Sequence, residues 1–242
     1  MTRTAKPTSP AAKDVEAASG VAAVNRALSL LCCFGNDDKS LGLADLASRT
    51  GLYKSTILRL AESLEQFDML VRDADGSFRL GTELVRLGAL AKRVAGNKVD
   101  VEKILAELVE LTGESATYYI RRGDFRLALF RVDSTKSVRD HIRPGDLLVL
   151  GKGAAGRVLL DSRPYTRRSG NRFEAIASLG ERDPEVAAIA GPVFQGDAVA
   201  GSISISGPKT RFTAAAVQRH RKVVEQACRK LSLILDPELE MR

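Results

Sequence analysis

The chain has 242 residues, of which 44% are hydrophobic and 28% charged, and its formal net charge is +7 at pH 7. These values suit one large globular domain or two modest ones, and they exclude a collagen-like, low-complexity or wholly disordered chain. The first residues are polar and no run of 18 apolar residues occurs, so we expect a cytoplasmic protein without a membrane partner.

The basic surplus is not concentrated at the N-terminus. Residues 1–92 carry 12 Lys and Arg against 11 Asp and Glu, so any DNA binding there must depend on local placement of charge. The three cysteines, Cys32, Cys33 and Cys228, are odd in number and lack metal-type spacing, and they fall in apolar helical patterns. We therefore expect buried thiols, no disulfide framework and no metal site.

The N-terminal part has the pattern of three helices followed by a hairpin. Residues 1–20 are predicted to be a tail, and apolar spacing predicts a helix over 21–34. A short helix through 43–47 ends at Thr50-Gly51, and a third helix runs from Leu52 to about Phe67. Strands at 69–72 and 77–80 flank an Asp-Gly turn. This order predicts a winged helix-turn-helix over residues 21–81, in which the third helix enters the DNA major groove.

The third helix has two distinct faces. Its inward face is apolar and comprises Ile57, Leu60, Ala61 and Leu64, whereas its outward face comprises Lys54, Ser55, Leu58, Arg59 and Glu62. Lys, Ser, Thr and Arg side chains supply the donors that phosphates and base edges accept, which favours DNA binding. The alternative is a small helical subdomain with a hairpin and no nucleic-acid role.

Residues 82–96 are predicted to be a linker helix. Apolar residues from Leu80 to Val94 step by four and three through Leu84, Leu87 and Ala91, a seam suited to helix pairing. Two heptads allow either dimerisation or packing against the helix's own domain.

From residue 97 to 236 the pattern alternates helix and strand and predicts an α+β domain, mainly antiparallel, before a tail at 237–242. The expected helices lie at 101–111, 157–161 and after Thr213, and the expected strands at 116–121, 125–132, 147–150, 185–194 and 198–206. Residues 163–172, with Arg163, Arg167, Arg168 and Arg172, are predicted to be a basic connection. The fold class is therefore α+β.

Two motifs in this part could carry chemistry. Gly151-Lys152-Gly153-Ala154-Ala155-Gly156 matches a GxGxxG dinucleotide fingerprint, but no parallel strand follows at the needed distance, so a small ligand beside bare backbone N–H groups fits better. The strand 202–206 places three serines on one face, either solvated or lining a pocket. His141, expected on an exposed strand, and His220, expected at a core edge, have no nucleophile pattern beside them. We therefore expect no enzyme and no cofactor.

The motifs resemble the IclR family of bacterial transcription regulators over residues 21–236. In the N-terminal part the resemblance rests on residues 24–28 (VNRAL), 43–47 (LADLA), 54–60 (KSTILRL) and 78–81 (FRLG). In the C-terminal part it rests on residues 153–157 (GAAGR), 178–186 (SLGERDPEV) and 204–208 (SISGP). Their order along the full length, more than any single motif, makes the resemblance specific.

The resemblance implies a winged helix-turn-helix, a linker helix and a GAF-like effector-binding domain with an antiparallel sheet and flanking helices. It implies double-stranded operator DNA and a small-molecule effector, an organic acid or aromatic metabolite, as partners, and a homodimer or dimer-of-dimers. The implied DNA contacts are Arg26, Tyr53, Lys54, Ser55, Thr56 and Arg59, with Arg72 and Ser77 in the wing. The implied effector contacts are Ala154, Ala155, Val186, Ala188, Ser202 and Ser204.

Two departures from the family pattern matter for the DNA sequence that is read. Tyr53 stands where proline is common, and Leu58 stands where an aromatic or polar residue is frequent. A helix N-terminus after residue 153 and the serine hydroxyls would suit a carboxylate, so the expected effector is a small organic acid. The alternative function is a nucleotide-binding enzyme or sensor that uses loop 151–156.

Overall fold

The computed structural model describes residues 20–94, 98–160, 172–237 and 239, and the chain divides into two compact units, Met1–Gly96 and Asn97–Arg242. Each unit has its own hydrophobic core. Several predicted segments lie outside the described residues: 1–19 of the tail, the end of the linker at 95–96, Arg163, Arg167 and Arg168, and most of the C-terminal tail.

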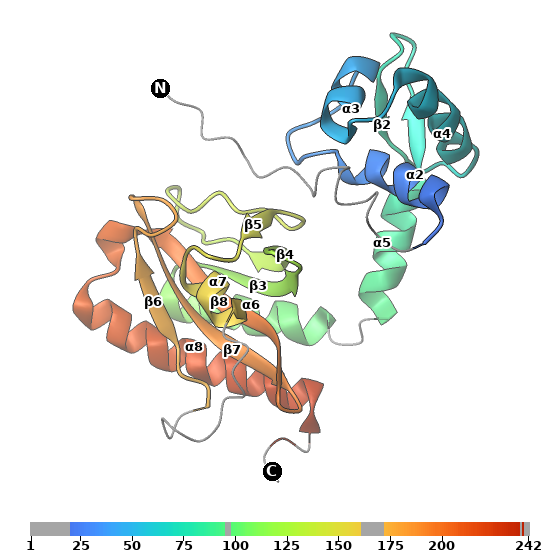
Figure 1. The fold of residues 1–242 in the computed structure, drawn as a ribbon. Helices are drawn as coiled ribbons and strands as arrows, with labels where there is room; N and C mark the ends of the chain where they lie inside the picture. Colours follow the sequence, from blue (N-terminus) through green and yellow to red (C-terminus); the bar gives the residue numbers. More distant parts are fainter. Residues whose placement is uncertain (1–19, 95–97, 161–171, 238, 240–242) are drawn as a thin grey trace. The chain divides into compact units, whose positions relative to one another are not determined.

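The first unit contains four helices and a two-stranded sheet within its described part (Figure 1). The helices are α2 (Ala22–Cys32), α3 (Leu43–Thr50), α4 (Lys54–Gln66) and α5 (Thr82–Val94), and the strands are β1 (Leu70–Arg72) and β2 (Phe78–Leu80). The two strands pair antiparallel, with Leu70 opposite Leu80. Leu30, Leu46, Ile57, Leu70 and Phe78 form the buried centre of this unit. The apolar spacing that predicts these elements therefore corresponds to the faces that they bury.

The second unit is built on a six-stranded sheet in which every observed pairing is antiparallel, in the order β5-β4-β3-β8-β7-β6. Its strands are β3 (Ser115–Arg122), β4 (Phe125–Val132), β5 (Leu147–Val149), β6 (Ile176–Leu179), β7 (Val186–Gln195) and β8 (Ala198–Pro208). Its helices are α6 (Lys98–Thr112), α7 (Ala154–Leu160) and α8 (Ala214–Leu235), with a 3₁₀ turn, η1 (Lys209–Arg211), before α8. The α+β class predicted from the sequence is confirmed.

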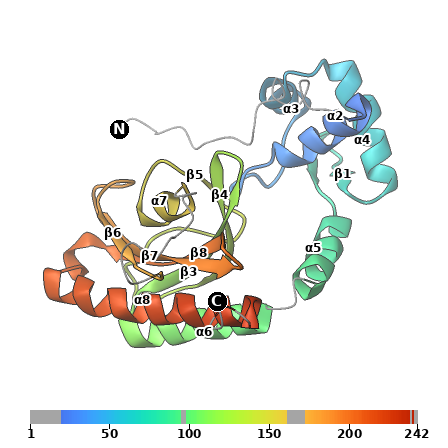
Figure 2. The same ribbon diagram turned by 60° about the horizontal axis from the view of Figure 1, so that its bottom comes forward.

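The sheet has a helical layer on each face. Helices α6 and α8 run side by side along one face, and α7 lies on the other (Figure 1, Figure 2). Ile203 and Ile205 of β8 point into the core under α6 and α8, whereas Ala154 and Ala155 of α7 pack with Tyr119 and neighbouring residues on the opposite face. The alternation of side chains along β8 thus turns its serines toward the α7 side.

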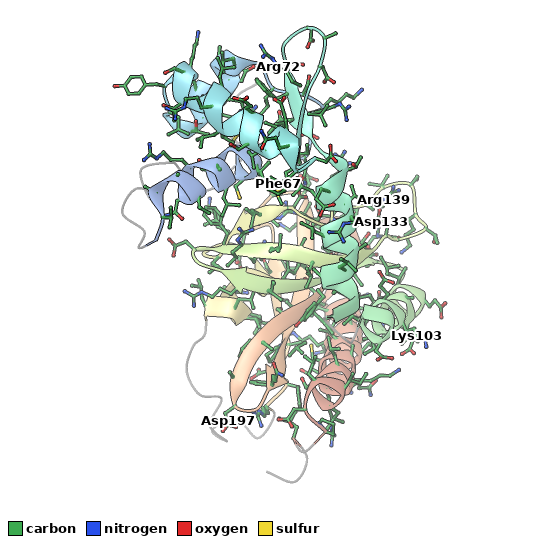
Figure 3. The ribbon with its side chains drawn as sticks, turned by 90° about the vertical axis from the view of Figure 1, so that its right-hand side faces the viewer. Phe67, Arg72, Lys103, Asp133, Arg139 and Asp197 are labelled. Carbon is green, nitrogen blue, oxygen red and sulfur yellow. The ribbon has the colours of Figure 1, made fainter. Side chains whose placement is uncertain are left out.

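Thr213 caps α8 as predicted, because its hydroxyl accepts a hydrogen bond from the backbone N–H of Ala216 at 3.3 Å. Helix α8 is amphipathic, and Val224, Cys228 and Leu231 on its inner side are fully buried. The turn between β7 and β8 carries Asp197 at the end of the hairpin (Figure 3).

Several sequence predictions were wrong in detail. Strand β6 was not predicted. Helix α7 begins at Ala154, as expected from a helix N-terminus after residue 153, although the helical pattern itself was recognised only from 157. Cys32 is exposed and Cys33 half-buried, so Cys228 alone of the three thiols is buried as predicted. His141 lies in an exposed loop and not on a strand. In the part of the chain that the structure covers, no helix is long and apolar enough to cross a bilayer.

Candidate functional site

The first unit forms a helix-turn-helix from α3 and α4. Gly51 ends α3 with φ of +70°, a left-handed conformation that glycine adopts without strain, and its N–H donates to the carbonyl of Ala47 at 2.8 Å. The chain then turns and α4 begins at Lys54. Ile57 and Ala61 hold the inner face of α4 in the core, so the opposite face of that helix is exposed.

The exposed face of α4 carries the polar side chains predicted for it. Lys54, Ser55 and Arg59 are exposed, and Thr56 is half-buried beside them. Two apolar residues share this region: Tyr53, which is 84% exposed just before the helix, and Leu58, which is 38% exposed. The face therefore combines cationic donors with apolar groups that can contact thymine methyls.

The wing and α2 place the remaining candidate DNA contacts. Arg72 is exposed at the end of β1, where its guanidinium lies 5.6 Å from the ring centroid of Phe78 (Figure 3). The backbone N–H and the hydroxyl of Ser77 both donate to the carboxylate of Asp75, at 2.9 and 2.7 Å. Arg26 lies on α2, where its Nε donates to the carbonyl of Ala22 at 3.2 Å. All eight candidate DNA contacts thus belong to the first unit.

The second unit encloses a small polar cavity between the sheet and the start of α7. It holds about 20 Å³ of water-accessible space, room for about one or two water molecules. Its lining residues are Tyr119, Arg126, Asp140, Gly153, Ala154, Ala155, Ser178, Arg182, Val186, Ala188, Ser204 and Ser206. Five of the six predicted effector contacts line it, although they come from distant parts of the sequence.

Ser202 is the predicted contact that does not line the cavity. Its side chain is fully buried, and its hydroxyl donates to the carbonyl of Gly191 on the neighbouring strand at 3.0 Å. Ser204 and Ser206 are 4% and 6% exposed, so the solvated-face alternative for these serines is wrong.

Charged side chains in the cavity were missed by the sequence analysis. Arg182 donates to the carboxylate of Asp140 at 2.7 Å, and Arg126, which is 4% exposed, lies close to both. Burial lowers the pKa of Arg126, with the nearby charge of Arg182 acting in the same direction and Asp140 opposing it. Burial raises the pKa of the Tyr119 hydroxyl, which therefore stays neutral. The cavity is thus a low-dielectric site with more positive than negative charge.

A pattern in the sequence could have identified Arg126. Strand β4 buries alternate residues, and Arg126 occupies an inward position on the same face as Ala128, two residues along. An arginine at an inward strand position requires hydrogen-bonding partners or a ligand. Its position in the strand therefore indicates a binding site more strongly than its charge alone does.

The GxGxxG loop packs against this arginine. A Cβ at Gly156 would lie 2.0 Å from the carbonyl oxygen of Leu150 and 2.5 Å from Nη1 of Arg126, so the glycine is required by close packing. Strand β5 before the loop pairs antiparallel with β4 at the edge of the sheet, and β6, the next strand described, pairs antiparallel with β7. The parallel βαβ unit of a dinucleotide site is therefore absent from the part of the chain that the structure shows.

Among the described residues, no three His, Cys, Asp or Glu side chains converge as metal ligands would. His220 is half-buried on α8, with its ring edge-on to Phe212 at 6.0 Å between centroids. Neither observation adds a catalytic centre to the two regions already described.

A helix-turn-helix with a polar exposed helix, followed by an antiparallel sheet unit with a small polar cavity, defines a DNA-binding protein of the regulator class. Residues 23–74 match the model of the IclR helix-turn-helix domain. The transcriptional regulator BhcR of Paracoccus denitrificans is 27% identical over 253 residues, which cover 92% of this chain and 90% of that protein.

Two solved structures have the same fold. An IclR transcriptional regulator from Silicibacter sp. TM1040 aligns with a TM-score of 0.77 and 24% identity, covering 88% of this chain and 96% of that chain. An IclR homologue from Microbacterium hydrocarbonoxydans, solved in complex with 4-hydroxybenzoate, aligns with a TM-score of 0.70 and 17% identity, covering 89% and 99%. The helix-turn-helix of this chain is thus of the IclR type, and the whole chain is similar in fold to IclR transcriptional regulators.

Proposed function

We propose that this protein binds double-stranded operator DNA through residues 21–81 and that a small organic acid, bound in the domain at 97–236, controls that binding. In this proposal the linker predicted at 82–96, whose described part is α5, connects the two domains. The exposed face of α4 carries the proposal, because a helix held by its apolar face behind a glycine turn presents donors to the major groove.

Lys54, Ser55, Thr56 and Arg59 contact bases and phosphates from α4 in this proposal, with Tyr53 beside them. Arg26 and the wing residues Arg72 and Ser77 contact the backbone on either side. Phosphate contacts fix the position of the protein on the duplex, and contacts from α4 select the sequence. The protein acts in the cytoplasm, where operator DNA is found, and it needs no cofactor or catalysis.

The polar cavity supports an organic acid as the effector. Two arginines and one aspartate line it, together with serine hydroxyls, so a ligand with a carboxylate and hydrogen-bonding groups would satisfy them. A related fold holds 4-hydroxybenzoate, which is an acid of this class. Helix α7 has seven residues, so the case rests on the arginines and not on its N-terminus.

Fluorescence anisotropy with labelled duplexes from the DNA that flanks this gene tests the proposal. We expect binding that weakens with salt, because counterions are released from the phosphates, and an affinity that changes when a small acid is added. An unrelated duplex of equal length is the control. Equal affinity for both duplexes at physiological salt would contradict the proposal.

A further inference from the structure

Arg126 is a buried cation with an unsatisfied donor. The residue is 4% exposed, and its Nε atom is buried without a hydrogen-bond partner in the described part of the chain. A buried charged donor without a partner costs free energy, and such groups are rare in folded proteins unless a ligand completes them.

The rest of the guanidinium is fixed in position. Nη1 donates to the carbonyl oxygens of Val149 and Lys152 at 3.1 and 2.6 Å, which uses both of its protons. Nη2 lies beside Gly153, 3.6 Å from where a Cβ would stand, and the centre of the guanidinium is 5.3 Å from the ring centroid of Tyr119. The loop 151–156 therefore holds one end of the group, and the edge made by Nε and Nη2 carries the remaining donors.

That edge belongs to a site with excess positive charge. Asp140, the carboxylate of the cavity, already accepts a hydrogen bond from Arg182 at 2.7 Å, and the backbone carbonyl of Asp140 accepts one from Arg131. Among the described residues, no carboxylate forms an ion pair with Arg126. An anion that reaches the Nε and Nη2 edge can form the two parallel hydrogen bonds of an arginine–carboxylate pair.

The remaining lining limits the rest of the ligand. Ser204 and Ser206 of β8 and Ser178 of β6 offer hydroxyls, so a hydroxyl on the ligand would be satisfied. The water-accessible space of about 20 Å³ is far smaller than a cavity that encloses a drug-sized molecule. Because that space holds only about one or two water molecules, an acid must displace the cavity walls to enter, and the smallest acids require the least displacement.

We propose that Arg126, held by the glycine loop, is the residue that binds the carboxylate of the effector, and that the effector is a short-chain hydroxy acid with one carboxylate. This inference rests on the proposed function and deepens it by naming the anchoring side chain and the ligand class. Arg126 selects for negative charge, the serines select for a hydroxyl, and the volume of the cavity selects against an aromatic ring.

Thermal melting of the full-length wild-type protein tests the ligand class without any substitution. Glycolate is compared with glycolamide, its uncharged counterpart of nearly the same shape, and with 4-hydroxybenzoate, at constant ionic strength. A ligand that binds the folded state alone raises the melting temperature, and we expect saturating glycolate to raise it by about 2–4 °C or more. We expect little change with the other two compounds.

Substitution of the anchor tests the residue. We expect Arg126→Gln to bind glycolate about tenfold to a hundredfold more weakly than the wild type, because a hydrogen-bonded charge is lost. The affinity of Arg126→Lys should lie between those of the wild type and Arg126→Gln, because lysine keeps the charge but not the paired donors. The matched control is Arg122→Gln, an exposed arginine at the end of β3. All three variants are also assayed for DNA binding without ligand, and their affinity should equal that of the wild type.

Each adverse result has a definite meaning. Equal stabilisation by glycolamide, no stabilisation by glycolate, or wild-type affinity of Arg126→Gln for glycolate would overturn the inference. A larger shift with 4-hydroxybenzoate would overturn the size limit. If Arg126→Gln does not fold, the comparison of glycolate with glycolamide on the wild type still tests whether the site binds a carboxylate. If the wild type shows no specific binding to operator DNA, the proposed function itself is refuted.

Discussion

Glycine at position 156 is the residue whose replacement tests the packing of the cavity most directly. A Cβ there would lie 2.0 Å from the carbonyl oxygen of Leu150, and backbone atoms cannot move away cheaply. We expect Gly156→Ala to lower the free energy of unfolding by about 1–3 kcal/mol, the usual cost of overpacking. Urea denaturation of the wild type and the variant measures this difference in unfolding free energy.

Gly151 provides the matched control for that experiment. It lies in the same loop, and an added Cβ would meet nothing within 4 Å. Gly151→Ala should therefore change the unfolding free energy little. Equal destabilisation by both substitutions would show that loop flexibility matters more than the close approach at position 156.

His220 gives stability a dependence on pH. Burial lowers its pKa, with Arg219 acting in the same direction, so the folded state resists protonation more than the unfolded state does. The unfolded state therefore takes up the extra proton as the pH falls below about 6.5, and stability declines through that range and levels off below the folded pKa. Above about pH 6.5 the histidine is mostly neutral in both states, so His220 no longer makes the stability depend on pH.

The measurement compares urea midpoints of the wild type and His220→Gln between about pH 5.5 and 7.5, the range that spans an ordinary histidine pKa. We expect the wild type to lose more stability toward low pH than the variant. His141→Gln, in an exposed loop, is the control and should follow the wild type. Parallel curves for the wild type and His220→Gln would refute this role.

At the scale of single side chains, the sequence predicted which face of a strand a residue occupies better than it predicted the residue's hydrogen-bond partners. Alternation along β8 correctly separated Ser204 from Ile203 and Ile205, because a strand has a fixed period. The same rule could not reveal that Ser202 donates to Gly191, or that Asp140 reaches Arg182, because both contacts join residues from separate segments.

At the scale of secondary structure, α4 is the element with the clearest expected effect on DNA binding. Arg59 lies on its exposed face, little more than one turn from Lys54, where it can reach a guanine edge. We expect Arg59→Ala to weaken operator binding by about 1–3 kcal/mol and to relax the preference at one base pair. Anisotropy on single-base operator variants measures both effects.

Lys103→Ala is the control for that prediction, because Lys103 projects from α6 in the second unit (Figure 3). It removes the same number of positive charges from a surface with no role in the proposed interface. Unchanged affinity and preference for Arg59→Ala would mean that α4 is not the reading helix.

The elements that the sequence missed are the short ones. Strand β6 has four residues at the edge of the sheet, too few to show a period of two, and its pairing with β7 is set by the sheet and not by its own pattern. Helix α7 was expected after residue 153, but its pattern was recognised only from 157, because the glycine and alanine residues of its first turn carry no amphipathic signal. Helices α4 and α8 were predicted because each spans three or more turns with a buried stripe.

At the scale of the whole molecule, an exposed apolar stripe predicts self-association. Val21, Val24 and Leu28 follow one side of the first helix and are 66%, 52% and 50% exposed. Contiguous apolar surface of this kind marks an interface. We expect a dimer or dimer-of-dimers in sedimentation, whose two-fold symmetry would match inverted half-sites about one helical turn apart.

Replacing Val24 and Leu28 together by lysine should raise the dissociation constant of the dimer at least about tenfold, since two charges would then be buried at the interface. Val138→Lys is the control, because Val138 is also an exposed apolar residue, at 64%, but lies in the second unit. A wild-type protein that sediments as a monomer at micromolar concentration in reducing buffer would contradict the prediction.

The pairing of β3 with β8 also bears on how the chain is made. Ser115 pairs with Ser206, so the centre of the sheet cannot close until the ribosome has synthesised nearly the whole polypeptide, and α8 comes later still. The helix-turn-helix, by contrast, has all of its core residues by Phe78. Because domains fold as units during synthesis, starting from the N-terminus, a nascent chain acquires its DNA-reading surface while the cavity that would control it does not yet exist.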